Sequence, residues 1–255
     1  MYKSIIPTIT ILLSANVYGT ETLSVSSIEW CPQLCSNGDK AGYVFDTVQE
    51  VFKDSPYVLK NKVYPWTRAI RNVESGESHA LLSPAKQEAP GLKFPTQEVG
   101  LQRMCFFKKS SSSWVYNGLA SLENVRVGIA TDTSIEELNG YIRDNPHKFD
   151  SMPYSDSYIK TSLKKLDKDR IDAFVFTHNS TIYELQQLGL SDDYKAGGCV
   201  SSAKIYMAFT PEESDSSKIN EMISYFDKKM VELKESGKVA EIMAAYGLED
   251  WQSHL

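Results

Sequence analysis

The chain has 255 residues, of which 42% are hydrophobic and 24% charged, and its formal net charge is −6. A pI near 5.3 argues against nucleic-acid binding, because such binding needs a basic face that displaces counterions. The four cysteines are too few for a scaffold that is held together mainly by disulfides.

The N-terminus has the pattern of an export signal. Lys3 supplies the positive start, residues 5–17 are mostly apolar, and Val17-Tyr18-Gly19 offers small residues at the two outer positions of a cleavage site. The apolar run is too short to span a membrane. A buried first strand or helix is the alternative. We expect residues 1–19 to be a cleaved signal peptide and the mature protein to be soluble in the periplasm.

The first half of the mature chain alternates strand and helix patterns. Apolar residues at helical spacing follow Gly42, and Pro65 suits the first turn of a second helix, which Gly76 ends. Strands are expected at residues 23–30, 57–64, 79–83 and 99–108, and helices at residues 42–52 and 65–76.

The second half continues this alternation. Strands are expected at residues 125–130, 171–176 and 204–210, and helices at residues 135–144, 161–169, 181–188 and 216–236. Strands that alternate with helices at this spacing predict an α/β fold with largely parallel sheets. The strands form two groups, before residue 105 and after residue 124, and this grouping suggests two lobes.

Six segments of the chain form a recognisable series. They are "GYVFD" at 42–46, "PWTRA" at 65–69 with Gly76, "LKFP" at 92–95, "LENVRVGIATDTS" at 122–134, "RIDA" at 170–173, and "IYMAF" at 205–209 with the "LKESG" and "YGL" ending. In order and spacing these segments resemble the extracellular solute-binding proteins of the polar amino-acid transport class (solute-binding protein family 3). The resemblance covers nearly the whole mature chain.

This resemblance implies a two-lobe periplasmic-binding-protein (Venus flytrap) fold, type II-like, with two strands that cross between the lobes. The crossings would lie near residues 98–104 and 201–209. Lobe 1 would comprise residues 20–103 and 210–255, and lobe 2 residues 104–209. A small polar molecule would bind in the interlobe cleft, and hinge closure would report its presence to an ABC permease or a periplasmic sensor domain. The protein is expected to be a monomer without cofactor.

Two charged ligand anchors of this family are absent from the sequence. The family's arginine for the ligand carboxylate corresponds to Glu88, six residues before Phe94, and its aspartate for the amino group corresponds to Thr177. A buried carboxylate without a cationic partner repels a ligand carboxylate, because desolvation magnifies the charge. We therefore expect a ligand other than an ordinary α-amino acid.

Other polar and aromatic residues are candidate substitutes for these anchors. The aromatic and cationic ones suit stacking and anion contact, and the hydroxyl and amide ones suit polar contacts at strand ends or helix N-termini. Core packing, surface ion pairs and ordinary caps are the structural alternatives. The predicted ligand-binding residues are Trp30, Trp66, Arg68, Ser83, Glu88, Thr133, Ser134, Thr177 and Asn179.

The four cysteines of an exported chain favour disulfides, and three pairings are possible. Cys31 and Cys35 lie in one loop, whereas Cys105 and Cys199 each lie beside an implied interlobe crossing. We favour Cys31–Cys35 with Cys105–Cys199. A metal site is the alternative, but the cysteines lack finger-like spacing and nearby histidines, so no metal is expected.

Enzyme signatures are sparse. The sequence has no G-x-S-x-G, Walker, G-x-G-x-x-G or H-E-x-x-H motif. We therefore expect a binding protein rather than an enzyme. One alternative is a periplasmic lyase or hydrolase with Glu88 as acid or base, although Glu88 is equally compatible with a solvated loop position. Another is a degenerate cleft whose surface contacts a receptor. The sequence leaves open the ligand's identity and the choice between import and signalling.

Overall fold

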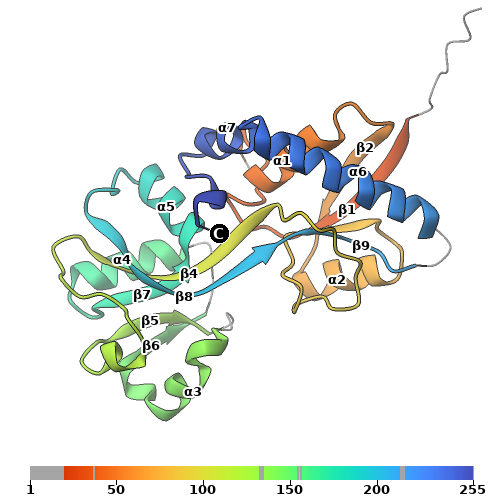
Figure 1. Cartoon of the computed structure of the whole chain (residues 1–255). Coiled ribbons are helices and arrows are strands. Elements are labelled where there is room, and N and C mark those ends of the chain that lie inside the picture. Colours follow the sequence, from red (N-terminus) through yellow and green to blue (C-terminus); the bar gives the residue numbers. More distant parts are fainter. Residues whose placement is uncertain are drawn as a thin grey trace, which may run out of the picture.

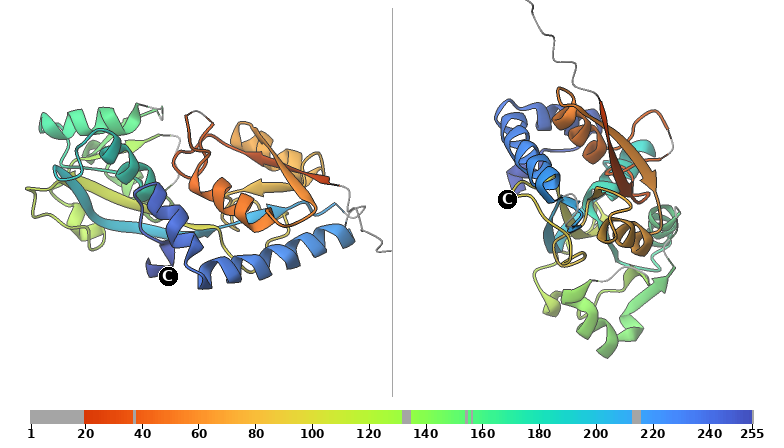
Figure 2. Two further views of the ribbon diagram at one scale, coloured as in Figure 1. Left: turned by 90° about the horizontal axis from the view of Figure 1, so that it is seen from above. Right: turned by 90° about the vertical axis from the view of Figure 1, so that its right-hand side faces the viewer.

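The computed structural model describes residues 20–36, 38–131, 135–153, 155, 157–212 and 216–254. The predicted signal peptide lies outside these residues, as do Thr133 and Ser134. Within them the chain forms an elongated molecule of two lobes (Figure 1; Figure 2). Each lobe has its own sheet, and two long strands connect the lobes.

The sheet of lobe 1 has four strands in the order β2-β1-β3-β9. Strand β1 pairs in parallel with β2 and with β3, and β9 closes the sheet antiparallel to β3. The strands are β1 (Glu21–Ser27), β2 (Tyr57–Val63), β3 (Ala80–Leu82) and β9 (Met207–Phe209).

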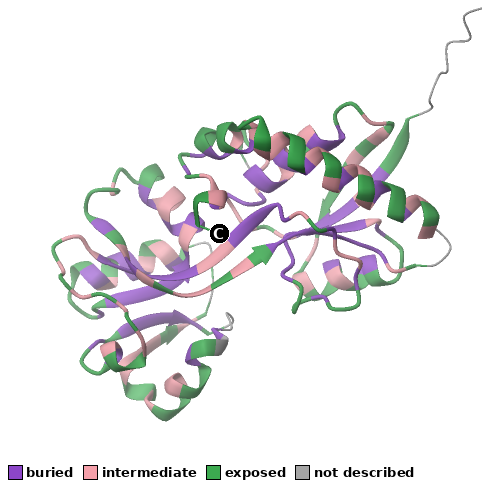
Figure 3. Cartoon of the chain, in the orientation of Figure 1, coloured by how far each residue is buried: buried purple, intermediate pink, exposed green. Residues whose placement is uncertain are grey.

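Helices cover both faces of this sheet. The helices are α1 (Tyr43–Phe52), α2 (Trp66–Glu74), α6 (Ser216–Glu235) and α7 (Lys238–Ala245), and a 3-10 turn, η4 (Trp251–His254), ends the chain. Along β3, Ala80 and Leu82 pack in the cluster of α1, α6 and α7, whereas Leu81 packs in the cluster of α2. This alternation is the two-residue period of a strand that is buried on both faces. Strands β3 and β9 are buried throughout, whereas the edge strand β2 is largely exposed (Figure 3).

Lobe 2 contains a five-stranded sheet in the order β6-β5-β7-β4-β8. Strands β5, β6 and β7 are parallel, and β4 runs antiparallel to β7 and β8. Helices α4 and α5 pack on one face, and α3 packs on the other. The elements are β4 (Gly100–Lys109), η1 (Leu119–Leu122), β5 (Val127–Ala130), α3 (Glu136–Asp144), η2 (Pro146–Lys148), β6 (Phe149–Met152), α4 (Tyr158–Asp167), β7 (Ala173–Thr177), α5 (His178–Gln187) and β8 (Tyr194–Ile205).

Strands β4 and β8 form the connection between the lobes. They pair from Gly100↔Ile205 to Lys109↔Tyr194, with bulges on either side of Cys105. The disulfide Cys105–Cys199 joins them, and Cys31–Cys35 closes a short loop in lobe 1, so the favoured pairing is confirmed. The predicted lobe boundary at residue 209 falls after β9, which pairs within lobe 1. We therefore propose that the second crossing ends before Met207.

The sheets differ from the prediction in several respects. The expectation of largely parallel sheets is wrong for β4, β8 and β9, because the chain enters and leaves lobe 2 on neighbouring strands of opposite direction. Strand β6 and the first part of β8 were not expected, since "FDSM" is short and "YKAGGCVSSA" is poor in branched apolar residues. Helices α4 and α5 each begin three residues earlier than predicted.

A buried carboxylate anchors the base of the crossing strands. Glu98 is 3% exposed and lies just before β4. It pairs with Lys234 of α6 and with Lys204 of β8 at 3.3 Å, and it accepts a 3.3 Å hydrogen bond from Trp251 Nε1. Burial alone would raise the pKa of Glu98, but the hydrogen bond and charge of Lys234 lower it to about 2. Both crossings and the C-terminal segment therefore meet at one carboxylate.

We predict that Lys234→Met lowers the free energy of unfolding by about 2–4 kcal/mol, because it leaves a buried carboxylate without its main partner. Chemical denaturation at pH 7 measures this loss. Lys229→Met on the same helix is the matched control, since Lys229 pairs with Glu232 on an exposed surface and such pairs contribute about 0–1 kcal/mol. Equal losses in the two variants would contradict this role for Glu98.

We also predict an acid-sensitive stability that depends on Glu98. The pKa of Glu98 is about 2 in the folded chain and has an ordinary value of 4.5, so the unfolded chain binds more protons between these values. The Glu98 contribution is therefore present above about pH 5 and is lost as the pH falls toward 2, by on the order of 3 kcal/mol. Denaturation at several pH values measures this loss. Between pH 5 and pH 2 the free energy of unfolding should fall less in Glu98→Gln than in the native protein.

Candidate functional site

The carboxyl ends of the parallel strands bring several predicted site residues to the region between the lobes. Trp30 lies three residues after β1, and Ser83 directly follows β3 in lobe 1. Thr177 is the last residue of β7 in lobe 2. In α/β sheets ligands bind at this edge, where loops and helix N-termini collect.

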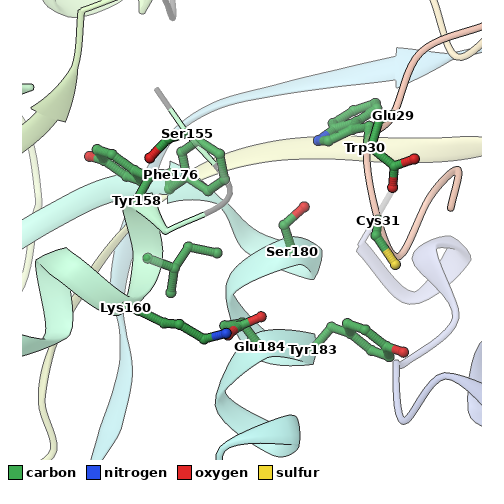
Figure 4. Close-up of a pocket in the computed structure, with 11 residues that line it drawn as sticks. Glu29, Trp30, Cys31, Ser155, Tyr158, Lys160, Phe176, Ser180, Tyr183 and Glu184 are labelled. Atoms are coloured by element: carbon green, nitrogen blue, oxygen red, sulfur yellow. The ribbon is translucent and has the colours of Figure 1, made fainter. Parts of the chain in front are cut away.

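A cavity of about 540 Å³ lies between the lobes at this edge. Figure 4 shows Trp30 of lobe 1 on one side, Tyr158 and Phe176 of lobe 2 opposite, and Ser180 between them. The walls therefore combine aromatic faces with a hydroxyl group. The lining residues are Glu29, Trp30, Cys31, Ser155, Tyr158, Ile159, Lys160, Phe176, Ser180, Tyr183 and Glu184.

The charged residues of this cavity already have partners in the protein. Lys160 pairs with Glu184 at 3.1 Å, and the carboxylate of Glu29 accepts a 2.8 Å hydrogen bond from the backbone of Ser36. A ligand in this cavity would thus meet aromatic surface and hydroxyl groups, together with the Lys160–Glu184 ion pair and the carboxylate of Glu29. This lining suits a compact ligand with an apolar or cationic portion.

The disulfide loop fixes the position of Trp30. The backbone N–H of Trp30 donates to the carbonyl of Leu34 at 2.8 Å, and Leu34 returns a 2.9 Å hydrogen bond. The disulfide Cys31–Cys35 closes the same loop. Gln33, which is 1% exposed, reaches Ser180 of lobe 2 through a 3.3 Å hydrogen bond.

The same loop covers the N-terminus of α1. The amides of Tyr43 and Val44 donate to the carbonyls of Pro32 and Gln33 at 2.9 and 3.0 Å. Gly42 has φ +101°, and a Cβ atom there would lie 2.4 Å from the carbonyl oxygen of Gln33, so this close packing requires glycine. The first N–H groups of α1 are therefore occupied by the loop, and they are not available to an anionic ligand.

A second, smaller interlobe cavity of about 220 Å³ contains Glu88. The Glu88 side chain is exposed, which corrects the premise of a buried carboxylate. Its Oε2 accepts a 2.7 Å hydrogen bond from the amide of Ala85. Desolvation by surrounding atoms still raises the pKa of Glu88, although the Ala85 amide opposes the shift. The other lining residues are Gln87, Gln102, Met104, Glu137, Ser201, Ser202 and Ala203.

Ser83 combines two unfavourable features at the end of β3. Its φ is +68°, in the left-handed region that non-glycine residues seldom adopt. Its side chain is 3% exposed, and its Oγ has no hydrogen-bond partner among the described residues. Its amide donates to the carbonyl of Tyr206, between β8 and β9. Strain and an unsatisfied hydroxyl at a strand end are typical of ligand sites.

Thr177 and Asn179 lie in contacts between structural elements rather than in a described cavity. Thr177 Oγ1 lies 3.7 Å from the sulfur of Met104 in β4. Asn179 Nδ2 donates to the hydroxyl of Tyr43 in lobe 1 at 3.2 Å, and the Oδ1 atom of Asn179 lies 3.2 Å from His178 Nδ1. Asn179 therefore links the two lobes.

His178 and Arg103 extend this link to β4. Arg103 Nη2 lies 3.0 Å from His178 Nδ1. Burial, followed by the charge of Arg103, lowers the pKa of His178 to about 4, so the imidazole is neutral at pH 7. Burial also lowers the pKa of Arg103. A neutral imidazole nitrogen can accept from the guanidinium, so Arg103 and His178 form a stable polar contact.

The remaining predicted residues lie elsewhere. Trp66 is partly buried and packs on the α2 cluster. The guanidinium of the exposed Arg68 lies 5.1 Å from the centre of the Tyr64 ring. Neither residue lines a described cavity. Thr133 and Ser134 lie outside the described residues.

Sequence reasoning missed most of the lobe 2 wall of the larger cavity. Tyr158 lies before the predicted helix start at residue 161, and neither Tyr158 nor Ser180 was among the predicted site residues. The buried run "AFVFTHNS" was the available signal, since Phe176 and Ser180 flank the strand-to-helix junction at residues 177–178.

No protein-family model matches the sequence, and no curated protein matches it. Solved structures do match it closely in fold. The probable amino-acid ABC transporter extracellular-binding protein ytmK from Bacillus subtilis has a TM-score of 0.68 at 17% identity, with 89% of this chain and 97% of that chain covered. The unliganded, open L-cystine solute receptor of Neisseria gonorrhoeae has a TM-score of 0.66 at 14% identity, with 92% and 95% covered.

A histidine kinase sensor domain with similarity to periplasmic binding proteins also matches, with a TM-score of 0.64 at 17% identity and coverage of 90% and 98%. These matches confirm the two-lobe, Venus-flytrap α/β fold and the resemblance to extracellular solute-binding proteins at the level of the fold. Among the described residues, no helix has both the length and the apolar character needed to cross a membrane.

We predict that Ser83→Gly raises the melting temperature of the ligand-free protein, because it removes the left-handed strain and the unsatisfied hydroxyl together. The expected gain is about 1–2 kcal/mol. Ser83→Ala removes only the hydroxyl and should give a smaller gain. Thermal denaturation of the native protein and the two variants gives their melting temperatures, which should be highest for Ser83→Gly and lowest for the native protein. A Ser83→Gly variant that is less stable than the native protein would contradict the prediction.

Proposed function

We propose that this chain is a solute-binding protein that captures a small polar ligand between its two lobes. The supporting observation is the larger cavity, whose wall is built by Trp30 from lobe 1 and by Tyr158, Phe176 and Ser180 from lobe 2. A ligand that contacts both walls stabilises the closed arrangement of the lobes, because it binds that arrangement better than the open one.

We further propose that the ligand is not an ordinary α-amino acid. Glu88 and Thr177 stand where binding proteins of the resembled family place an arginine and an aspartate. Glu88 lines an interlobe cavity without a cationic side chain among its described lining residues. Thr177 is buried and lies against Met104. Neither position offers the positive charge that the carboxylate of an α-amino acid needs, and Thr177 carries no charge for its ammonium group.

The same proposal includes export and a partner. Residues 1–19 would direct the chain to the periplasm as a cleaved signal peptide. The bound form would then be recognised by an ABC permease or by a periplasmic sensor. The similarity in fold to a transporter binding protein and to a kinase sensor domain supports both kinds of partner.

A lyase that uses Glu88 as acid or base is the alternative. The raised pKa of Glu88 favours such a role, but the Ala85 amide stabilises its charged form and the side chain is exposed. The solved structures compared above carry names of binding and sensor proteins. We therefore propose binding without turnover.

We predict that a screen of small polar solutes will find a ligand that raises the melting temperature, since binding to the folded state alone stabilises it. Trp30→Ala should weaken that ligand roughly tenfold to thirtyfold in calorimetric titration, because it removes one aromatic wall. Trp66→Ala is the matched control and should leave affinity unchanged. Unchanged affinity in Trp30→Ala would contradict the proposed cavity.

A further inference from the structure

The smaller interlobe cavity places two carboxylates on opposite lobes. Glu88 lies on the loop after β3 in lobe 1, and Glu137 lies in the first turn of α3 in lobe 2. Crossing strands supply the floor, with Gln102 from β4 and Ser201 from β8. No lysine, arginine or histidine is among the described residues that line this cavity.

Two like charges on opposite lobes oppose closure. The repulsion between such a pair grows as the lobes approach and as water leaves the cavity, because the effective dielectric constant falls. Lys86, two residues before Glu88, has its ammonium 5.0 Å from the centre of the Tyr206 ring and does not line the cavity. A cation bound between the lobes would offset the repulsion of Glu88 and Glu137 and would favour closure.

Ser83 begins the loop that carries Glu88, five residues before it. It is 3% exposed, and its hydroxyl has no partner among the described residues, although it is not one of the residues that line this cavity. A buried hydroxyl without a partner is unfavourable, and a change in the cleft that supplies a donor would remove that penalty. Within the cavity, the side-chain oxygens of Gln102 and Ser201 are acceptors for N–H groups, as are the two carboxylates.

We propose that the ligand is an organic amine cation without an α-carboxylate, held by Glu88 from lobe 1 and Glu137 from lobe 2. This inference rests on the proposed function and names the ligand class of the same cleft. A carboxylate-bearing ligand would meet two negative side chains and no positive one. A bare divalent cation fits less well, because the described residues contain no group of three metal-ligating side chains.

Matched pairs of amines and their parent amino acids test this ligand class. Agmatine differs from arginine, cadaverine from lysine, and histamine from histidine by the α-carboxylate alone. We expect at least one amine to raise the melting temperature and to bind at least tenfold more tightly than its parent in calorimetric titration at low salt. Calcium and magnesium chloride complete the panel, and binding of either metal in preference to every amine would overturn the inference.

Variants of the two carboxylates test their roles. Glu88→Gln and Glu137→Gln should each weaken the amine roughly tenfold, since each loses a charge-assisted contact. Glu235→Gln, an exposed carboxylate at the end of α6, is the matched control and should leave affinity unchanged. Native affinity in both Glu88→Gln and Glu137→Gln would overturn the inference.

The outcomes separate this inference from the proposed function. If an amino acid binds as tightly as its amine, or if only uncharged or anionic solutes bind with a dependence on Trp30, then the inference fails and the proposed function stands. If no solute of either panel binds, both fail. Small-angle scattering supplies a further check, because the radius of gyration should fall on addition of the amine and remain unchanged on addition of its parent.

Discussion

The two-lobe arrangement depends on one buried negative charge. Glu98 lies where the chain leaves lobe 1, and an isolated carboxylate in that position would be strongly destabilising. Its partners are Lys204 from the returning strand β8 and Lys234 from helix α6. Segments far apart in the chain are thereby held together at the base of the hinge. Beyond this point the chain enters lobe 2 along β4 and returns along β8, so these two paired strands are the covalent connection between the lobes.

Direct side-chain contacts between the lobes lie beside the two interlobe cavities. Asn179 binds Tyr43, and Gln33 binds Ser180, so the first turn of α5 touches lobe 1 directly. The larger cavity lies beside this contact and carries aromatic walls. The smaller cavity lies over the crossing strands and carries unneutralised carboxylates. Apolar contact and charge are thus provided by different parts of the same cleft.

The sequence predicts much of the fold but only part of the site. Strong periodicity located α1, α2 and α6, and the order of motifs indicated the two lobes and their crossings. Most of strand β8 was not predicted, because its own residues are rich in glycine and serine. It forms a strand by pairing with β4, which is distant in sequence. Trp30 and Glu88 each line an interlobe cavity, but the opposite wall of each cavity is built by residues of the other lobe. Periodicity within one segment carries no information about such contacts.

The connectivity of the lobes has a mechanical consequence. Lobe 2 is inserted between two strands of lobe 1, β3 and β9, and the disulfide Cys105–Cys199 joins its entrance to its exit. Strand β1 and helix α7 both belong to lobe 1. Tension applied between residues 20 and 254 therefore passes through lobe 1, and lobe 2 lies outside the load path. A tether at either of these positions would hold one lobe fixed and leave the other free to swing.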